Sequence, residues 1–115
     1  MDLARPAYRR RVNGADLAIA DAPEASRFEA RLGAEVAGWI DYRRLEGRLI
    51  LLHTEVPPAF AGRGVAGALA GHVLDAALAA GTRVTVKCPF VATFVTRHPE
   101  YAGIVTPARA GRRPA

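Results

Sequence analysis

Three glycines between residues 62 and 67 can bind a phosphate group through the backbone. Gly62, Gly64 and Gly67 have the spacing G-x-G-x-x-G, and an alanine-rich segment that favours a helix follows them. The first turn of a helix has unpaired N–H groups and a partial positive charge, so it attracts anions. Glycines keep side chains away from a pyrophosphate, and Arg63 adds a positive charge beside them. The spacing therefore predicts an anion site at this turn.

Two well-known nucleotide sites that use such glycines do not fit this sequence. A dinucleotide site requires an acidic residue about twenty positions later, where this chain has Arg83 and Lys87 but no acid. Its glycine turn also follows the strand directly, whereas residues 57–61 intervene here. An ATP-type phosphate loop requires Lys and then Ser or Thr after the last glycine, and Gly67 is not followed by them. The anion site must belong to another kind of ligand.

Two prolines before the glycines predict a cleft in the sheet. Pro57 and Pro58 cannot donate a hydrogen bond to a neighbouring strand, so pairing must stop at the end of the strand that precedes them. If two parallel strands separate there, their free backbone groups can pair with an extended ligand that carries amides. A pyrophosphate at a helix start, joined to an amide-containing arm in a strand cleft, describes coenzyme A.

Hydrophobic periodicity predicts the elements that position this site. Turn-forming residues dominate 13–25, with Asn13-Gly14 as the strongest turn signal. We expect antiparallel strands at 26–31, 36–43 and 49–56, a helix at 65–80 ended by Gly81, a strand at 83–88, a short helix at 90–97 and an edge strand at 101–105. The strand at 83–88 should run parallel to the one at 49–56, because a helix connects them.

The blocks "HTEVPPAFAGRGVAGAL", "KCPFV" and "RHPEYAGIV" resemble the small, single-domain branch of the GCN5-related N-acetyltransferases (GNAT). The resemblance extends from about Phe28 to Val105. It implies an α/β (α+β) fold with a mixed, mostly antiparallel sheet, one long helix and one short helix. It also implies that the sheet is splayed between the two central parallel strands, which end at Val56 and Cys88, and that acetyl-CoA lies in the gap.

The family's pyrophosphate segment reads R/Q-x-x-G-x-G/A. Gly64 and Ala66 occupy its last two defined positions, whereas Ala61 stands where Arg or Gln is usual. This departure keeps the backbone contacts but removes one side chain, for which Arg63 can substitute. The residues expected to contact the coenzyme are Val56, Gly62, Arg63, Gly64, Val65, Ala66, Gly67 and Arg97.

Acetyl transfer to an amine requires a base, because a lysine amine with a pKa of about 10.4 is charged at neutral pH. The resemblance places this base at Glu55, and the alternative is a solvent-exposed carboxylate without a catalytic role. His53 lies on the same strand face and either orients or relays, or is an ordinary half-buried histidine of the strand. The Val56 N–H is positioned to polarise the carbonyl. Cys88 matches a cysteine that lies near the coenzyme sulfur in this branch. Its role stays open between a covalent acetyl carrier, a proton donor to the leaving thiolate and a packing residue.

Other side chains are weaker candidates. Tyr101 is a possible acid, whereas a packing role in the core is preferred for Trp39, Phe90 and Phe94. No metal site is expected.

Composition indicates one domain of 115 residues, half of them hydrophobic. We expect a flexible basic arm at 1–11, the GNAT-like domain at 12–106 and a flexible basic tail at 107–115.

The net charge of +5 arises largely from arginines at the two ends. Nucleic-acid binding is disfavoured because stacking aromatics do not accompany them. A single cysteine, Cys88, and the lack of a long apolar run favour a cytoplasmic protein outside membranes, expected as a monomer or weak dimer.

These features predict an acetyl-CoA-dependent N-acetyltransferase. The acceptor would be a primary amine of a small molecule, or a lysine or N-terminus of a protein. The competing interpretation is a module that binds acyl-CoA without catalysis, in which the coenzyme site is kept but no transfer occurs.

Overall fold

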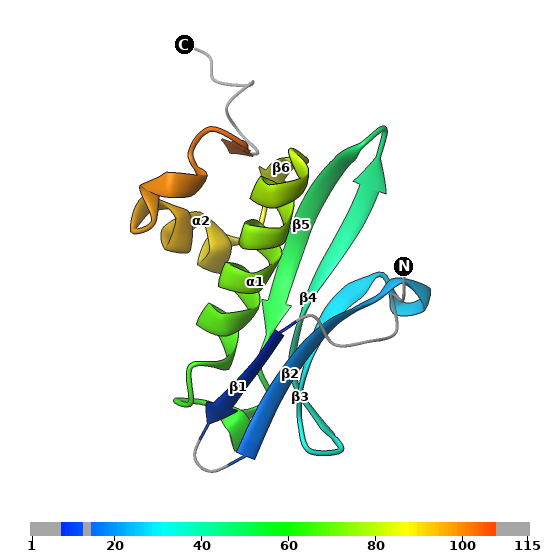
Figure 1. The fold of residues 1–115 in the computed structure, drawn as a ribbon, viewed down its shortest axis with the longest axis vertical. Coiled ribbons are helices and arrows are strands. Elements are labelled where there is room, and N and C mark those ends of the chain that lie inside the picture. Colours follow the sequence, from blue (N-terminus) through cyan, green and yellow to red (C-terminus); the bar gives the residue numbers. More distant parts are fainter. Residues whose placement is uncertain (1–7, 13–14, 108–115) are drawn as a thin grey trace.

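The computed structural model describes residues 8–12 and 15–107, which form one seven-stranded sheet with its strands in chain order (Figure 1). Its elements are β1 (Tyr8–Val12), β2 (Ala15–Ala22), β3 (Arg27–Leu32), β4 (Glu35–Leu45), β5 (Arg48–Glu55), α1 (Val65–Ala80), β6 (Arg83–Val86), α2 (Pro89–Thr96) and β7 (Val105–Pro107). Short 3-10 turns lie at Pro23–Ala25, Pro58–Phe60 and Pro99–Tyr101. Strands β1 to β5 are antiparallel, and β6 and β7 add in parallel. The expected fold class is confirmed.

One face of the sheet packs against the helices. Buried side chains alternate along the strands, as Leu17 and Ile19 do on β2. The buried residues of α1 recur at helical spacing, including Val65, Leu69 and Val73, and all of these belong to the same core. Helix α2 packs beside α1, because a Cβ placed on Gly71 would lie 3.7 Å from Phe94 Cζ. Both helices therefore lie on the same face of the sheet.

Strands β1 and β2 were not predicted. Residues 15–22 were interpreted as part of a turn-rich segment, and Tyr8–Val12 lies mostly within the expected basic arm, but the structure has a strand at each of these two places. The two strands pair as a hairpin, from Tyr8 opposite Ile19 to Val12 opposite Ala15. The alternation of hydrophobic and polar residues is hard to recognise in this segment because several of its residues are alanines. Residues 1–7, 13–14 and 108–115 lie outside the described residues, as does most of the expected tail.

The predicted edge strand at 101–105 was also misplaced. Tyr101 lies in the 3-10 turn that begins at Pro99, and β7 begins only at Val105. The Tyr101 hydroxyl donates a hydrogen bond to Asp75 of α1, and its ring is buried. A contact with the helix therefore determines the backbone here, instead of pairing within the sheet. The other predicted elements agree with the structure within a few residues, and α1 has the predicted bounds.

Gly38 allows three elements to approach one another closely. It lies on β4, next to a register shift against β3 between Ala30 and Arg31. A Cβ on Gly38 would lie 3.0 Å from the Glu55 carbonyl oxygen and 3.0 Å from Val65 Cγ1. A side chain at this position would therefore push apart β4, the end of β5 and the start of α1.

We expect Gly38→Ala to lower the free energy of unfolding by about 1–3 kcal/mol, the usual cost of overpacking. Chemical denaturation followed by circular dichroism measures this. Gly103→Ala is the matched control, because a Cβ there would meet nothing within 4 Å. Equal stabilities for the two variants would contradict the close approach at Gly38.

Candidate active site

Strands β5 and β6 separate before β5 ends. Their pairing runs from Arg48 opposite Arg83 to Leu51 opposite Val86, and the Lys87 N–H donates a last bond to the Leu51 carbonyl at 2.9 Å. Strand β5 continues to Glu55, paired with β4 on its other side after a register shift between Asp41 and Tyr42. Residues 52–55 therefore have no ladder with β6. This is the predicted gap between the parallel strands.

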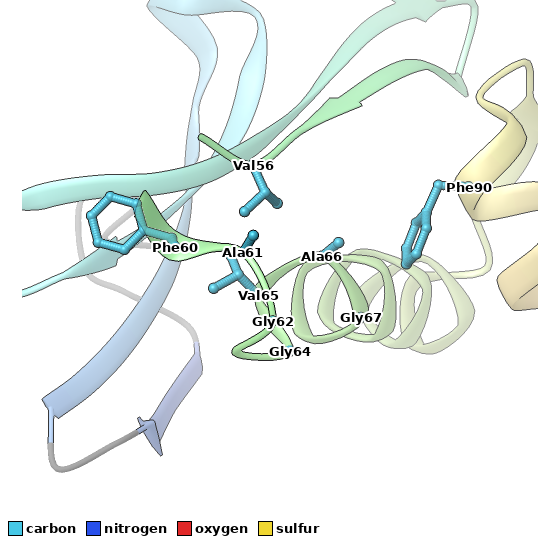
Figure 2. A pocket seen from close by; sticks show the side chains of 9 residues that line it. All are labelled: Val56, Phe60, Ala61, Gly62, Gly64, Val65, Ala66, Gly67 and Phe90. Atoms are coloured by element: carbon cyan, nitrogen blue, oxygen red, sulfur yellow. The ribbon is translucent and has the colours of Figure 1, made fainter. Parts of the chain in front are cut away.

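A pocket of about 310 Å³ lies beside this gap (Figure 2). Its lining includes Val56 just after β5, Phe90 at the start of α2, and Phe60 in the turn that follows β5. Its remaining lining residues come from the glycine turn and the first turn of α1, namely Ala61, Gly62, Gly64, Val65, Ala66 and Gly67. The pocket thus joins an apolar cavity to a helix N-terminus.

The start of α1 has the features of an anion site. Gly64 is the N-cap, with φ of 79°, a left-handed conformation that favours glycine, and no side chain caps the helix. The first helical bond runs from the Ala68 N–H to the Gly64 carbonyl at 3.0 Å. The N–H groups of Val65, Ala66 and Gly67 therefore precede the helical bonding and are available at the pocket.

The residues predicted to contact the coenzyme are only partly brought together. Val56, Gly62, Gly64, Val65, Ala66 and Gly67 line the pocket. Arg63 does not line it, and its guanidinium carbon lies 5.7 Å from the centre of the Phe60 ring, so it stays beside the pocket. Arg97 caps the C-terminal end of α2, about 10 Å along the helix from Phe90. Its contact with a phosphate stays a prediction.

Sequence reasoning missed two aromatic residues of the pocket. Phe90 was assigned to the core, but it is 40% exposed and lines the pocket. Phe60 was not considered. The available signal was position, because Phe90 begins the helix next to Cys88 and Phe60 lies just before the glycines. Each therefore had to lie near the predicted cleft.

Glu55 and His53 form a pair on the face of the sheet opposite the helices. Glu55 lies opposite Trp39 and His53 opposite Asp41, whereas Thr54 lies opposite the buried Ile40 on the helix-covered face. His53 Nε2 donates to Glu55 Oε1 at 2.8 Å, and the side chains are 58% and 47% exposed. The strand therefore brings the two side chains together, and both are accessible to a ligand on this outer face.

Trp39 also lies on the outer face, so its assignment to the core was wrong. It is half-buried, and the guanidinium carbon of Arg27 lies 4.4 Å from the centre of its ring. The guanidinium groups of Arg27 and Arg31 both donate hydrogen bonds to the Glu29 carboxylate. Burial raises the pKa of Glu29, but these bonds outweigh it and leave the pKa below its ordinary value.

Cys88 lies on the other side of the gap from the Glu55 pair. It is 2% exposed, it is the N-cap of α2, and its Sγ lies 3.1 Å from Thr54 Oγ1. His98, which follows α2, donates from Nδ1 to the Phe94 carbonyl at 2.8 Å. The sulfur and the carboxylate therefore face opposite sides of the sheet near the end of β5.

Tyr101 does not belong to this site. Burial and its hydrogen bond to Asp75 raise the pKa of Tyr101 to about 12, and it is not among the residues that line the pocket. Its phenol fastens the turn at 99–101 to α1, so the structure gives it a structural role.

Because the pKa of Tyr101 is raised, the stability of the folded protein depends on pH in the alkaline range. The unfolded tyrosine ionises near its ordinary pKa of 10.0, before the folded one, so the contribution of Tyr101 is complete below pH 10 and is lost as the pH rises to about 12. We expect the free energy of unfolding to fall across this range, and to fall less in Tyr101→Phe. Denaturant titrations at several pH values measure it, and equal slopes for both proteins would contradict it.

Among residues 8–12 and 15–107, no three His, Cys, Asp or Glu side chains gather closely enough to hold a metal ion. In the same residues, neither helix has the length and hydropathy needed to cross a bilayer.

Comparison with known proteins matches the part of the chain that builds this site. The family model described as GCN5-related N-acetyl-transferase matches residues 27–104, which run from β3 almost to β7. Protein NATD1 of Bos taurus is similar, with 36% identity over 75 residues. The match covers 64% of this chain and 66% of NATD1, slightly less than two thirds of its length. The chain belongs to the GCN5-related N-acetyltransferase family.

Proposed function

We propose that the protein transfers the acetyl group of acetyl-CoA to a primary amine, on a small molecule or on a protein lysine or N-terminus. The observation that carries this proposal is the gap between β5 and β6 beside the uncapped start of α1. The N–H groups of Val65, Ala66 and Gly67 suit the pyrophosphate. The free backbone of residues 52–55 suits the amide-bearing arm, which then leads the thioester to the gap.

The two faces of the sheet carry different parts of the proposed reaction. The ammonium group of the amine enters from the outer face, gives one proton to Glu55 and, now neutral, attacks the acetyl carbon, while the Val56 N–H stabilises the developing oxyanion. The attacking nitrogen then releases its second proton to solvent. His53 holds the carboxylate through its bond to Oε1. The carbon–sulfur bond then breaks, and the coenzyme thiolate takes the proton of the Cys88 thiol from the other side. Glu55 afterwards loses its proton to solvent, and Cys88 regains one.

Calorimetric titration with acetyl-CoA and with free CoA tests the coenzyme site. Transfer to lysine peptides and to small amines, followed by mass spectrometry, then tests the reaction. Absence of coenzyme binding would overturn the proposal. Binding without transfer to any amine would support the non-catalytic acyl-CoA module instead, and an acetylated Cys88 would show that the cysteine carries the acetyl group covalently.

A further inference from the structure

One hydrogen bond crosses the gap between β5 and the chain that leaves β6. Thr54 Oγ1 lies 3.1 Å from Cys88 Sγ, beyond the last paired residues of the two strands, Leu51 and Val86. Among the described residues, this hydroxyl is the hydrogen-bond partner of the sulfur. The bond therefore fixes the position of Cys88 at a level where the sheet no longer does.

The backbone directs the Thr54 hydroxyl to this place. Thr54 lies opposite Ile40, so its side chain is on the helix-covered face, whereas its neighbours His53 and Glu55 are on the outer face. Cys88 is the last residue before α2, and its carbonyl accepts the Ala92 N–H of that helix at 3.0 Å. Both ends of the bond are therefore held by regular backbone elements.

We propose that Thr54 is a positioning residue for Cys88, a role that rests on the proposed acyl transfer. When Cys88 gives up its proton, it becomes a thiolate whose residue is only 2% exposed, so water solvates it poorly. The Thr54 hydroxyl then donates to the anion, and hydrogen bonding to the charged form favours that form. The start of α2, of which Cys88 is the N-cap, adds a partial positive charge.

Two substitutions distinguish the effect of the Thr54 hydroxyl oxygen from the effect of the size and shape of the side chain. Thr54→Val keeps the volume but removes the oxygen, and Thr54→Ser keeps the oxygen. Thr85→Val is the matched control, because Thr85 is a threonine of the neighbouring strand whose hydroxyl accepts a bond from Arg48 instead of contacting Cys88. Circular dichroism checks that each variant is folded.

Since Cys88 is the single cysteine of the chain, ultraviolet absorbance of the thiolate reports on it alone, after subtraction of a Cys88→Ser spectrum. The measurement uses coenzyme-free protein at the pH where the parent thiol is half ionised. We expect the thiolate-to-thiol ratio to fall about three- to tenfold in Thr54→Val. Thr54→Ser and Thr85→Val should stay within about twofold of the parent. An unchanged or higher ratio in Thr54→Val would overturn the proposal.

Steady-state kinetics distinguishes this result from failure of the proposed function. If the parent transfers acetyl groups, Thr54→Val should lower kcat and keep the KM for acetyl-CoA, and Thr54→Ser should restore kcat. If the parent binds coenzyme but transfers nothing, the proposed function fails while the thiolate ratio still decides whether Thr54 supports Cys88.

Discussion

Replacing Glu55 by glutamine is expected to lower kcat for acetyl transfer by about 10²–10⁴-fold, the usual contribution of a general base. Glutamine keeps the size of the side chain and one oxygen for His53, but it cannot accept the proton of the amine. The side chain faces away from the pocket that suits the coenzyme, so the affinity for acetyl-CoA should not change. Initial rates and calorimetry measure the two quantities on the same samples.

Glu35→Gln is the control for loss of a carboxylate, because Glu35 is an exposed residue at the start of β4. It should transfer acetyl groups at the parental rate. If Glu55→Gln is as active as this control, Glu55 is not the base and the amine must lose its proton to another group or to water.

Replacing Gly67 by alanine is expected to weaken acetyl-CoA binding about tenfold or more, while the fold becomes slightly more stable. A Cβ on Gly67 would meet no atom within 4 Å, and Gly67 lines the pocket. The methyl group would therefore stand where a pyrophosphate must approach the backbone. Alanine also favours the helix by up to about 1 kcal/mol, so lost binding would not arise from unfolding. Calorimetry and thermal unfolding measure both effects.

Gly71→Ala is the matched control, one helical turn further along α1. A Cβ there would make an ordinary contact of 3.7 Å with Phe94, and Gly71 does not line the pocket. Gly71→Ala should gain as much stability as Gly67→Ala, and its affinity for acetyl-CoA should equal that of the parent protein. Equal affinities of the two variants would show that the coenzyme does not approach the start of α1.

Local sequence patterns were sufficient for the elements around the gap. Helix α1 is an alanine-rich segment with Val65, Leu69 and Val73 at helical spacing, and it ends at Gly81, which adopts a left-handed C-cap with φ of 70°. The helical connection between β5 and β6 made their parallel pairing predictable. The prolines after β5 predicted a gap at the end of that strand, and the pairing with β6 stops earlier, at Leu51 and Val86. These predictions depend on residues close in sequence, and the structure confirms them.

Features that depend on distant residues could not be predicted from the sequence. Nothing near Gly38 indicates that Val65 and the Glu55 carbonyl approach it, and the register shift at Asp41 and Tyr42 decides which face carries His53. The bond between Thr54 and Cys88 joins residues 34 positions apart. Strand β2 was missed for a different reason, because turn-forming residues at both of its ends concealed the buried pair Leu17 and Ile19.

The opposite orientations of Cys88 and Glu55 have a kinetic consequence if transfer occurs at the gap. The coenzyme would arrive and depart on the helix side, and the amine on the bare side of the sheet, where no described helix lies. Neither substrate would then obstruct the entry of the other. Binding in random order would follow, and the acetylated product could dissociate before or after free CoA.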